Sequence, residues 1–222
     1  MIQAIVFDFD GVLADSEPLH LRAYQEVLAP LGVTLTREEY YAHLLGYDDE
    51  GVFRAVGKAA GWTLDGRRIA ALIGEKSRVF EDELARTDVL YPGAAECVER
   101  MAAAYPLGIV SGALKPEIVA VLRRGRLDRH FRFIVSAEDT PRSKPAPDPY
   151  LRAAALHGLP PPSCLSIEDS RWGIEAAKAA GLRCVGITHT YPAEALASAD
   201  AVIAALAEFT PELAAKLFAP GN

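Results

Sequence analysis

The feature that most constrains the fold of this 222-residue chain is the alternation of short apolar runs with amphipathic segments in its second half. Runs rich in β-branched residues predict strands buried on both faces of a parallel sheet, and helical spacing of apolar residues predicts helices between them. The expected strands are 107–110, 131–135, 164–167, 184–187 and 201–203, and the expected helices are 94–104, 116–124, 149–157 and 173–180. This order predicts a Rossmann-like, doubly wound parallel α/β sheet.

An opening strand and a helical insertion complete the predicted fold. Residues 2–7 form another apolar run that fits the same sheet, whereas helical periodicity prevails from residue 17 to about 86. Within that stretch, Thr36 and Glu39 resemble a capping box at the start of a helix. We therefore predict an α/β core domain of residues 1–15 plus 88–222 and an inserted all-helical domain of residues 16–87.

Composition narrows the class of protein. Half of the residues are hydrophobic and the formal charge is −7, which is typical of a globular enzyme or binding protein, and no basic tract indicates a nucleic-acid partner. Cys97, Cys164 and Cys184 are too few and too widely spaced for a disulfide framework or a zinc site, which favours free thiols in a reducing compartment. No apolar run approaches the roughly 20 residues of a membrane span. We expect a cytoplasmic protein without a membrane partner.

Polar residues follow four of the predicted strands. Because ligands of such sheets bind at the carboxyl ends of the strands, side chains at these positions are expected to converge. Each motif alone is a common turn or helix start, but all four together in this order favour a chemical role over a structural one. The residues are Asp8 and Asp10 after AIVF, Ser111 and Gly112 after LGIV, Lys144 after FIVS, and Glu168 and Asp169 after CLSI.

Four carboxylates in one crevice need a counter-charge, since their mutual repulsion would otherwise raise their pKa values. An all-oxygen set without a nearby His or Cys suits a hard divalent cation, and Mg²⁺ typically takes one or two carboxylates together with substrate phosphate. Lys144 is expected to neutralise part of the remaining negative charge. The sequence therefore predicts Mg²⁺ as the cofactor of a phosphate-binding site.

The two aspartates after the first strand have the chemistry of a nucleophile and its proton partner. An aspartate is ionised at neutral pH, so Asp8 is able to attack phosphorus directly. Asp10, two residues further on, is the candidate that protonates the leaving oxygen and later accepts a proton from water. Ser111 and the backbone amides of Phe9 and Gly112 are expected to donate hydrogen bonds to the phosphate oxygens.

The motifs DFDGV, VSGA, SKPAPDPY and IEDS together resemble those of the haloacid dehalogenase superfamily of aspartyl-phosphate enzymes. The resemblance spans almost the whole chain. Within the superfamily, the chain is similar to the β-phosphoglucomutase-like and phosphoglycolate-phosphatase-like branch, whose small helical cap follows the first motif. It implies Asp8 as nucleophile and Asp10 as general acid/base and backbone-carbonyl metal ligand. It also implies Lys144 as charge balancer and Asp169 as metal ligand, with Glu168 as a further ligand or one that acts through water.

The stretch LLGYDDEGVF separates a phosphatase from a sugar-phosphate mutase. Mutases of this branch carry a lysine before the glycine and an arginine three residues after it, where this chain has Leu45 and Asp49. Asp48, Asp49 and Glu50 are expected to repel a second phosphate, which disfavours a mutase. Lys76 matches another cap lysine of the branch, although a solvated helix face explains it equally well.

The histidines divide into two groups. His20 matches a histidine of the branch that reaches the general acid or the substrate, and simple helix packing is the open alternative. The others show no ligand spacing and are interpreted as structural or exposed: His43, His130, His157 and His189.

We predict a Mg²⁺-dependent phosphatase that acts on a small phosphorylated metabolite, such as a sugar phosphate, through an aspartyl-phosphate intermediate. A β-phosphoglucomutase-type mutase is the alternative, and a non-catalytic phosphate-binding module is a weaker one. We expect a monomer, with a homodimer as the alternative.

Overall fold

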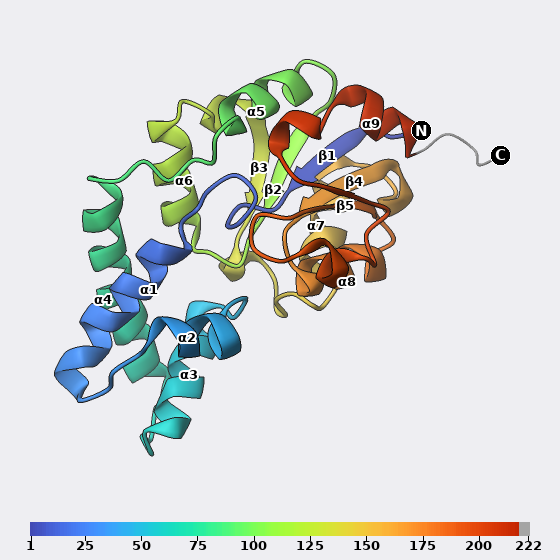
Figure 1. Cartoon of the computed structure of the whole chain (residues 1–222). Coiled ribbons are helices and arrows are strands. Elements are labelled where there is room, and N and C mark those ends of the chain that lie inside the picture. Colours follow the sequence, from blue (N-terminus) through green and yellow to red (C-terminus); the bar gives the residue numbers. More distant parts are fainter. Residues whose placement is uncertain (218–222) are drawn as a thin grey trace. The chain divides into compact units, whose positions relative to one another are not determined.

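A computed structural model describes residues 1–217 of the chain and contains a six-stranded sheet in the order β3-β2-β1-β4-β5-β6 (Figure 1). Every neighbouring pair is parallel. The strands are β1 (Ala4–Phe7), β2 (Leu107–Val110), β3 (Phe131–Val135), β4 (Cys164–Glu168), β5 (Arg183–Ile187) and β6 (Ala201–Ile203). The predicted doubly wound parallel sheet is therefore confirmed, and the strand order reverses beside β1.

Five helices connect or follow these strands, and each lies within two residues of its expected bounds where one was predicted. They are α5 (Ala94–Ala102), α6 (Lys115–Arg124), α7 (Asp148–His157), α8 (Arg171–Ala179) and α9 (Pro211–Lys216). Figure 1 shows α7 and α8 on one side of the sheet and α5 and α9 on the other.

The central strand β1 supplies apolar side chains to both faces of the sheet, because successive residues of a strand point in opposite directions. Val6 belongs to a buried cluster with Tyr150 of α7 and Ile174 of α8. Phe7 points the other way and meets the ring of Phe209 edge-on, at a centroid distance of 5.7 Å. Burial on both faces explains why β1 reads as a continuous apolar run.

The insertion after the first strand is entirely helical in the structure. Its elements are α1 (Glu17–Leu28), the 3-10 turn η1 (Ala29–Leu31), α2 (Arg37–Glu39), the π-helical turn η2 (Tyr40–Leu44), α3 (Asp49–Ala59) and α4 (Gly66–Leu84). The capping box of Thr36 and Glu39 is present. The helix that it opens keeps α-helical geometry for three residues and then widens into η2.

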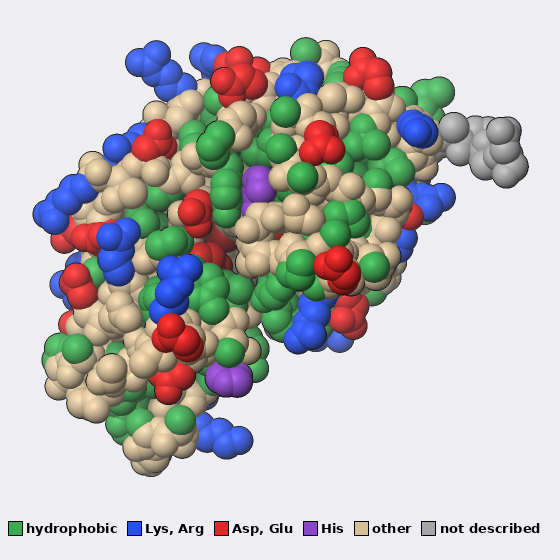
Figure 2. All heavy atoms as spheres, viewed as in Figure 1, with side chains coloured by type: hydrophobic (Ala, Val, Ile, Leu, Met, Phe, Trp, Pro, Cys, Tyr) green, Lys and Arg blue, Asp and Glu red, His purple; other side chains and the backbone are tan. Residues whose placement is uncertain are grey.

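The chain divides into two compact units, each described by itself below. The α/β unit comprises Met1–Asp15 and the chain from Leu90, and the helical unit comprises Ser16–Val89. On the face seen in Figure 2, basic and acidic side chains are interspersed. None of the helices in residues 1–217 is both long and apolar enough to cross a membrane.

Candidate active site

The polar residues singled out in the sequence stand at the carboxyl ends of the central strands. Asp8 directly follows β1, Ser111 follows β2, Glu168 ends β4 and Asp169 comes next. Lys144 lies in the loop between β3 and α7. Because the strands are parallel and β1 lies between β2 and β4, these side chains share one edge of the sheet.

Lys144 joins two of the carboxylates. Its Nζ lies 2.7 Å from Asp8 Oδ1 and 2.7 Å from Glu168 Oε1, and it also donates to the carbonyl oxygen of Val110 at 3.2 Å. The ammonium lies over the ring of Tyr150, 5.4 Å from its centroid. Only 13% of the lysine side chain is exposed, so both ion pairs are largely shielded from water.

Glu168 is wholly buried and has a second donor. The hydroxyl group of Tyr150 donates a hydrogen bond to Glu168 Oε1, the same oxygen that Lys144 contacts. On the other side, a Cβ atom at Gly173 would lie 1.9 Å from Glu168 Oε2. The first turn of α8 therefore needs a glycine at this position to leave room for the carboxylate.

Three carboxylates form a tight set. Asp8, Glu168 and Asp169 each offer one oxygen, and these oxygens all lie within 4.8 Å of one another. The carboxylate of Asp10 stands outside this set and accepts a hydrogen bond from Ser111 Oγ at 3.1 Å. The expected convergence of four side-chain carboxylates thus holds for three of them.

Burial and repulsion disfavour the ionised form of Asp8. Burial raises the pKa of Asp8 most, Glu168 and Asp169 raise it further, and Lys144 lowers it. Burial alone would lower the pKa of Lys144, but the carboxylates of Asp8 and Glu168 raise it above its ordinary value. Lys144 is therefore held as a cation, and one lysine does not balance the three acids.

This donor set fits a hard divalent cation. If all three carboxylates ionise, one ammonium leaves two negative charges in a buried place, which a divalent cation would balance, and the donors are all oxygens. Oxygen ligands of this kind are the ones that Mg²⁺ prefers. Asp8 and Asp169 are the more accessible donors, since one oxygen of Glu168 is already engaged by Lys144 and Tyr150.

The segment after Asp8 turns back sharply on itself. Gly11 has a positive φ of 77°, and its N–H donates to the carbonyl oxygen of Ala14 at 2.8 Å. A Cβ atom at residue 11 would lie 1.9 Å from Asp169 Oδ2. Glycine is therefore required here both by the backbone conformation and by the close approach of the Asp169 carboxylate.

The two predicted backbone donors lie in different surroundings. Phe9 is 2% exposed and sits between the two aspartates of the first motif. Gly112 is exposed, with open space where a side chain would be. The hydroxyl group of Ser111, the third predicted donor, donates a hydrogen bond to Asp10 and accepts one from the N–H of Ala113 at 3.0 Å.

Lys76 in the helical unit is completely buried, which overturns the alternative of a solvated helix face. Its Nζ lies 3.1 Å from Asp49 Oδ1 and 3.2 Å from Asp49 Oδ2. The ammonium also lies over the rings of Tyr24 and Phe80, at 5.5 and 5.1 Å from their centroids. The hydroxyl group of Tyr24 donates to Asp49 at 2.5 Å and belongs to the same cluster.

The acidic stretch after Gly46 is therefore not a row of open negative charges. Asp49 pairs with Lys76, and Asp48 caps α3 by accepting from the N–H of Gly51. Glu50 forms an exposed ion pair with Arg54 at 2.7 Å. The expectation that these three acids jointly repel a phosphate stays a prediction, and each of the three is engaged locally.

Two other predicted residues of the helical unit are buried. Leu45 is 7% exposed, so it is an apolar core residue of this unit. His20 is also 7% exposed, and its ring stacks on Phe80 at a centroid distance of 4.4 Å. This stacking supports the helix-packing interpretation of His20 within the unit.

Two residues near the carboxylates were not identified from the sequence. Tyr150 stands six residues after Lys144, at the end of the quoted motif SKPAPDPY, and contacts Glu168. His189 was interpreted as structural or exposed, but it is half-buried in the loop after β5 and contacts Gly11. Its place at the carboxyl end of a strand was the signal that would have found it.

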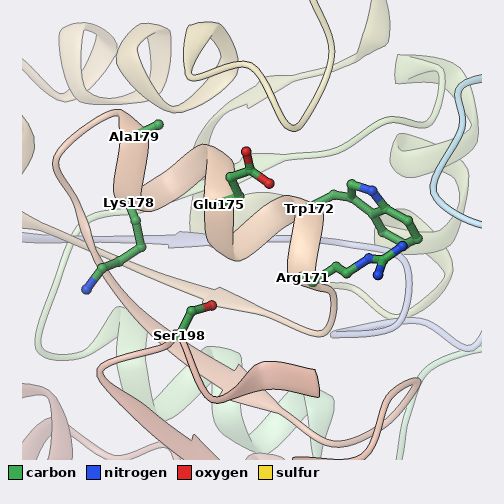
Figure 3. A pocket seen from close by; sticks show the side chains of 6 residues that line it. All are labelled: Arg171, Trp172, Glu175, Lys178, Ala179 and Ser198. Carbon is green, nitrogen blue, oxygen red and sulfur yellow. The ribbon is translucent and has the colours of Figure 1, made fainter. Parts of the chain in front are cut away.

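A pocket of about 690 Å³ lies along α8, and none of the three carboxylates lines it. Figure 3 shows Arg171 and Trp172 at one end of the helix, Glu175 in the middle and Lys178 at the other end. Arg171 lies over the Trp172 ring, and Lys178 pairs with Asp200 at 2.8 Å. The lining holds two cations and a single acid, so this pocket lacks the converging carboxylates of the other site.

Comparison with known proteins places the chain in a family. The family model for haloacid dehalogenase-like hydrolases matches residues 5–187. Hexitol phosphatase B of Escherichia coli K12 is 34% identical over 187 residues, which cover 83% of this chain and 82% of that protein. The chain therefore belongs to the enzymes of this hydrolase family, as the four motifs predicted.

Solved structures agree with this assignment. A mutant of CbbY from Rhodobacter sphaeroides, in complex with xylulose 1,5-bisphosphate, has a TM-score of 0.85 and 30% identity, and the match covers 94% of this chain and 96% of that chain. A β-phosphoglucomutase from Clostridium difficile has a TM-score of 0.86 at 21% identity, covering 98% and 97%, and supports the fold alone. By its fold, its motifs and its relatives, this protein is a haloacid dehalogenase-like hydrolase.

Proposed function

We propose that the protein is a Mg²⁺-dependent phosphatase that hydrolyses a small phosphorylated metabolite through a phosphorylated Asp8. The observation that carries this proposal is the buried set of Asp8, Glu168 and Asp169, balanced only in part by Lys144. A site with excess negative charge and one fixed cation suits a divalent cation and a phosphate ester together. The names of the similar proteins, which include hexitol phosphatase B, support the same reaction class.

In the first step, a carboxylate oxygen of Asp8 attacks phosphorus and the bond between phosphorus and the ester oxygen breaks. Asp10 gives its proton to the departing oxygen, which leaves as an alcohol. In the second step, water attacks the aspartyl phosphate while Asp10 takes a proton from it. Inorganic phosphate leaves, and both aspartates return to their starting states.

Four groups of this chain are proposed to hold the phosphate during these steps. Lys144 contacts Asp8 directly and neutralises charge beside the phosphate. Ser111 Oγ and the backbone amides of Phe9 and Gly112 supply hydrogen bonds to its oxygens. Asp8, Asp10 and Asp169 would hold Mg²⁺, with Asp10 using its carbonyl oxygen. The bound cation would supply charge neutralisation for the phosphate and the carboxylates.

The residues of the helical unit favour a substrate whose leaving group carries no second phosphate. The family resemblance assigns recognition of the leaving group to this unit. Here Lys76 is already paired with Asp49, and Leu45 is an apolar core residue. A second phosphate would have to displace Asp49 from Lys76, and losing that charge-assisted hydrogen bond costs roughly 1.5–3 kcal/mol. We therefore propose a phosphatase of monophosphate esters and disfavour the mutase.

Release of inorganic phosphate from a panel of sugar and polyol monophosphates tests the proposal, with and without Mg²⁺. The wild-type protein should release phosphate only with Mg²⁺, and Asp8→Asn should release none while keeping its thermal midpoint within a few degrees. Asp128→Asn is the matched control, because Asp128 is an exposed aspartate of the same unit. Undiminished release by Asp8→Asn would exclude Asp8 as the nucleophile.

The same panel of substrates distinguishes a phosphatase from a mutase. It should include β-glucose 1-phosphate, with glucose 6-phosphate measured as a product. Formation of glucose 6-phosphate without net release of phosphate would establish a mutase and overturn the interpretation of Leu45 and Asp49.

A further inference from the structure

His189 bonds to the backbone next to Asp10. Its Nδ1 lies 3.0 Å from the carbonyl oxygen of Gly11. A carbonyl oxygen only accepts hydrogen bonds, so the hydrogen is on Nδ1 of the imidazole. The donor therefore contacts the residue that directly follows Asp10.

The imidazole is also fixed by an aromatic neighbour. Its ring stacks on Tyr91, with centroids 3.9 Å apart and an angle of 25° between the planes. Tyr91 itself bonds to the same segment, because its N–H donates to the carbonyl oxygen of Leu13 at 3.0 Å. The side chain of His189 and the backbone of Tyr91 thus meet one turn of the chain at two points, Gly11 and Leu13.

That turn, residues 9–14, is tightly bonded internally. The N–H groups of Leu13 and Ala14 donate to the carbonyl oxygen of Phe9, and the N–H of Gly11 donates to Ala14. The carbonyl group of Gly11 is instead bonded to His189. His189 therefore orients a peptide group that the bonds within the turn leave to an outside donor.

Gly11 is closely packed around its Cα atom. A Cβ atom at this position would lie 1.9 Å from Asp169 Oδ2 and 2.7 Å from Thr190 Oγ1. The carbonyl group that His189 holds belongs to the peptide that joins Gly11 to Val12. A shift of this peptide would reach Asp10 through the backbone of Gly11, and the carboxylate of Asp10 is held by Ser111 at 3.1 Å.

We propose that His189 is a positioning residue that, through the Gly11 carbonyl group, sets the orientation of Asp10 for proton transfer to the leaving group. This inference rests on the proposed phosphatase function, in which Asp10 is the general acid. Burial lowers the pKa of His189, while its bond to Gly11 and the nearby Asp15 raise it. The donor is thus a neutral imidazole at neutral pH, with Nδ1 protonated.

The test compares two substitutions on two substrates. His189→Phe keeps a ring against Tyr91 but removes the donor, whereas His189→Asn places an amide N–H near the position of Nδ1. One substrate is an alkyl phosphate, whose leaving alkoxide needs a proton, and the other is p-nitrophenyl phosphate, whose leaving phenolate does not. The measured quantity is kcat/KM, which reports the steps up to loss of the leaving group.

For His189→Phe, kcat/KM on the alkyl phosphate should fall roughly tenfold, since a positioned general acid contributes about 10²–10⁴-fold and misorientation loses part of that. On p-nitrophenyl phosphate it should change less than about twofold, because no proton is required there. His189→Asn should restore most of the loss on the alkyl phosphate. His43→Asn, an exposed histidine of the helical unit, should behave as the wild type on both.

Equal losses on the two substrates would assign His189 a merely structural role and overturn the inference. No recovery in His189→Asn would overturn it as well, and this variant serves alone if His189→Phe does not fold. A wild-type protein without phosphatase activity on either substrate would instead overturn the proposed function itself.

Discussion

The two units of this protein each bury a lysine in a similar way, but the carboxylates gather differently around the two lysines. Lys144 in the α/β unit contacts a carboxylate that also accepts from a tyrosine, Tyr150, and it lies over the ring of that tyrosine. Lys76 in the helical unit contacts Asp49, which accepts from Tyr24, and lies over the ring of that tyrosine. The local construction is the same in both.

The difference lies in how closely the acids gather around each lysine. The ion pair of Lys76 with Asp49 is neutral when both side chains are ionised. Lys144 has two partners, Asp8 and Glu168, with Asp169 in the same set of oxygens. A buried lysine therefore does not by itself mark a site, whereas a surplus of buried carboxylates indicates a place for a further cation.

The largest effect is expected when Lys144 is replaced by methionine. Removal of the ammonium leaves the buried carboxylates of Asp8 and Glu168 without their cation, which costs about 3–5 kcal/mol of unfolding free energy. Phosphate release should also fall below detection. Urea denaturation and phosphate release measure the two effects, with the exposed Lys58→Met as control. A variant that kept both stability and rate would place Lys144 outside the site.

A double-mutant cycle on the Lys76–Asp49 ion pair should give the next largest effect. Lys76→Met alone leaves Asp49 buried with only its tyrosine donor and should cost about 3 kcal/mol. Lys76→Met combined with Asp49→Leu should cost less than about 1 kcal/mol, because apolar replacement of a whole buried pair is often neutral. Urea midpoints of the four proteins measure the cycle. Additive losses would show that the pair is not coupled.

His157 extends the comparison, because it is a half-buried base beside a cation. Burial and, to a smaller extent, the nearby Arg132 lower its pKa from 6.5 to about 4, whereas the carboxylates of Asp8 and Glu168 raise the pKa of Lys144. Between pH 4 and pH 6.5, His157 is therefore protonated in the unfolded chain but not in the folded chain. The free energy of unfolding is not reduced by this residue above pH 6.5, and it falls as the pH drops toward 4.

The expected loss from His157 is about 1–2 kcal/mol after allowance for its partial exposure. His157→Gln should remove this part of the pH dependence, which unfolding midpoints between pH 4 and pH 7 measure. An unchanged slope in the variant would show that His157 titrates normally in the folded protein.

The smallest effect is expected at an exposed ion pair. Arg54 and Glu50 lie 2.7 Å apart on α3 with about half of each side chain exposed. Arg54→Ala should cost about 0.3–0.5 kcal/mol, as helix pairs in water do. The loss should shrink in high salt, measured by the thermal midpoint. A loss as large as that for Lys76→Met would mean that burial does not set the strength of these pairs.

Much of the fold was readable because periodicity reports burial. The strands 107–110, 131–135 and 201–203 have the predicted bounds, since each is a compact apolar run. The widening of the helix after Glu39 into a π-turn was not readable, because the capping box specifies only where a helix begins.

The sequence predicted the site residues that directly follow a strand. Asp8, Ser111 and Glu168 stand at the strand ends where the sequence placed them. The pairing of Lys76 with Asp49 was not predicted, because these residues are 27 positions apart on different helices and side-chain pairing across helices leaves no local pattern. His189 was missed for a similar reason, since its partner Gly11 is 178 residues away.

Calorimetric titration with Mg²⁺ in the absence of substrate tests the central claim, that the α/β unit carries the unbalanced charge. We expect wild-type protein and Asp49→Asn to bind Mg²⁺ alike, and Asp169→Asn to bind it at least about tenfold more weakly, because this variant lacks one ligand. Equal binding by wild-type protein and Asp169→Asn, or loss of binding in Asp49→Asn alone, would contradict it.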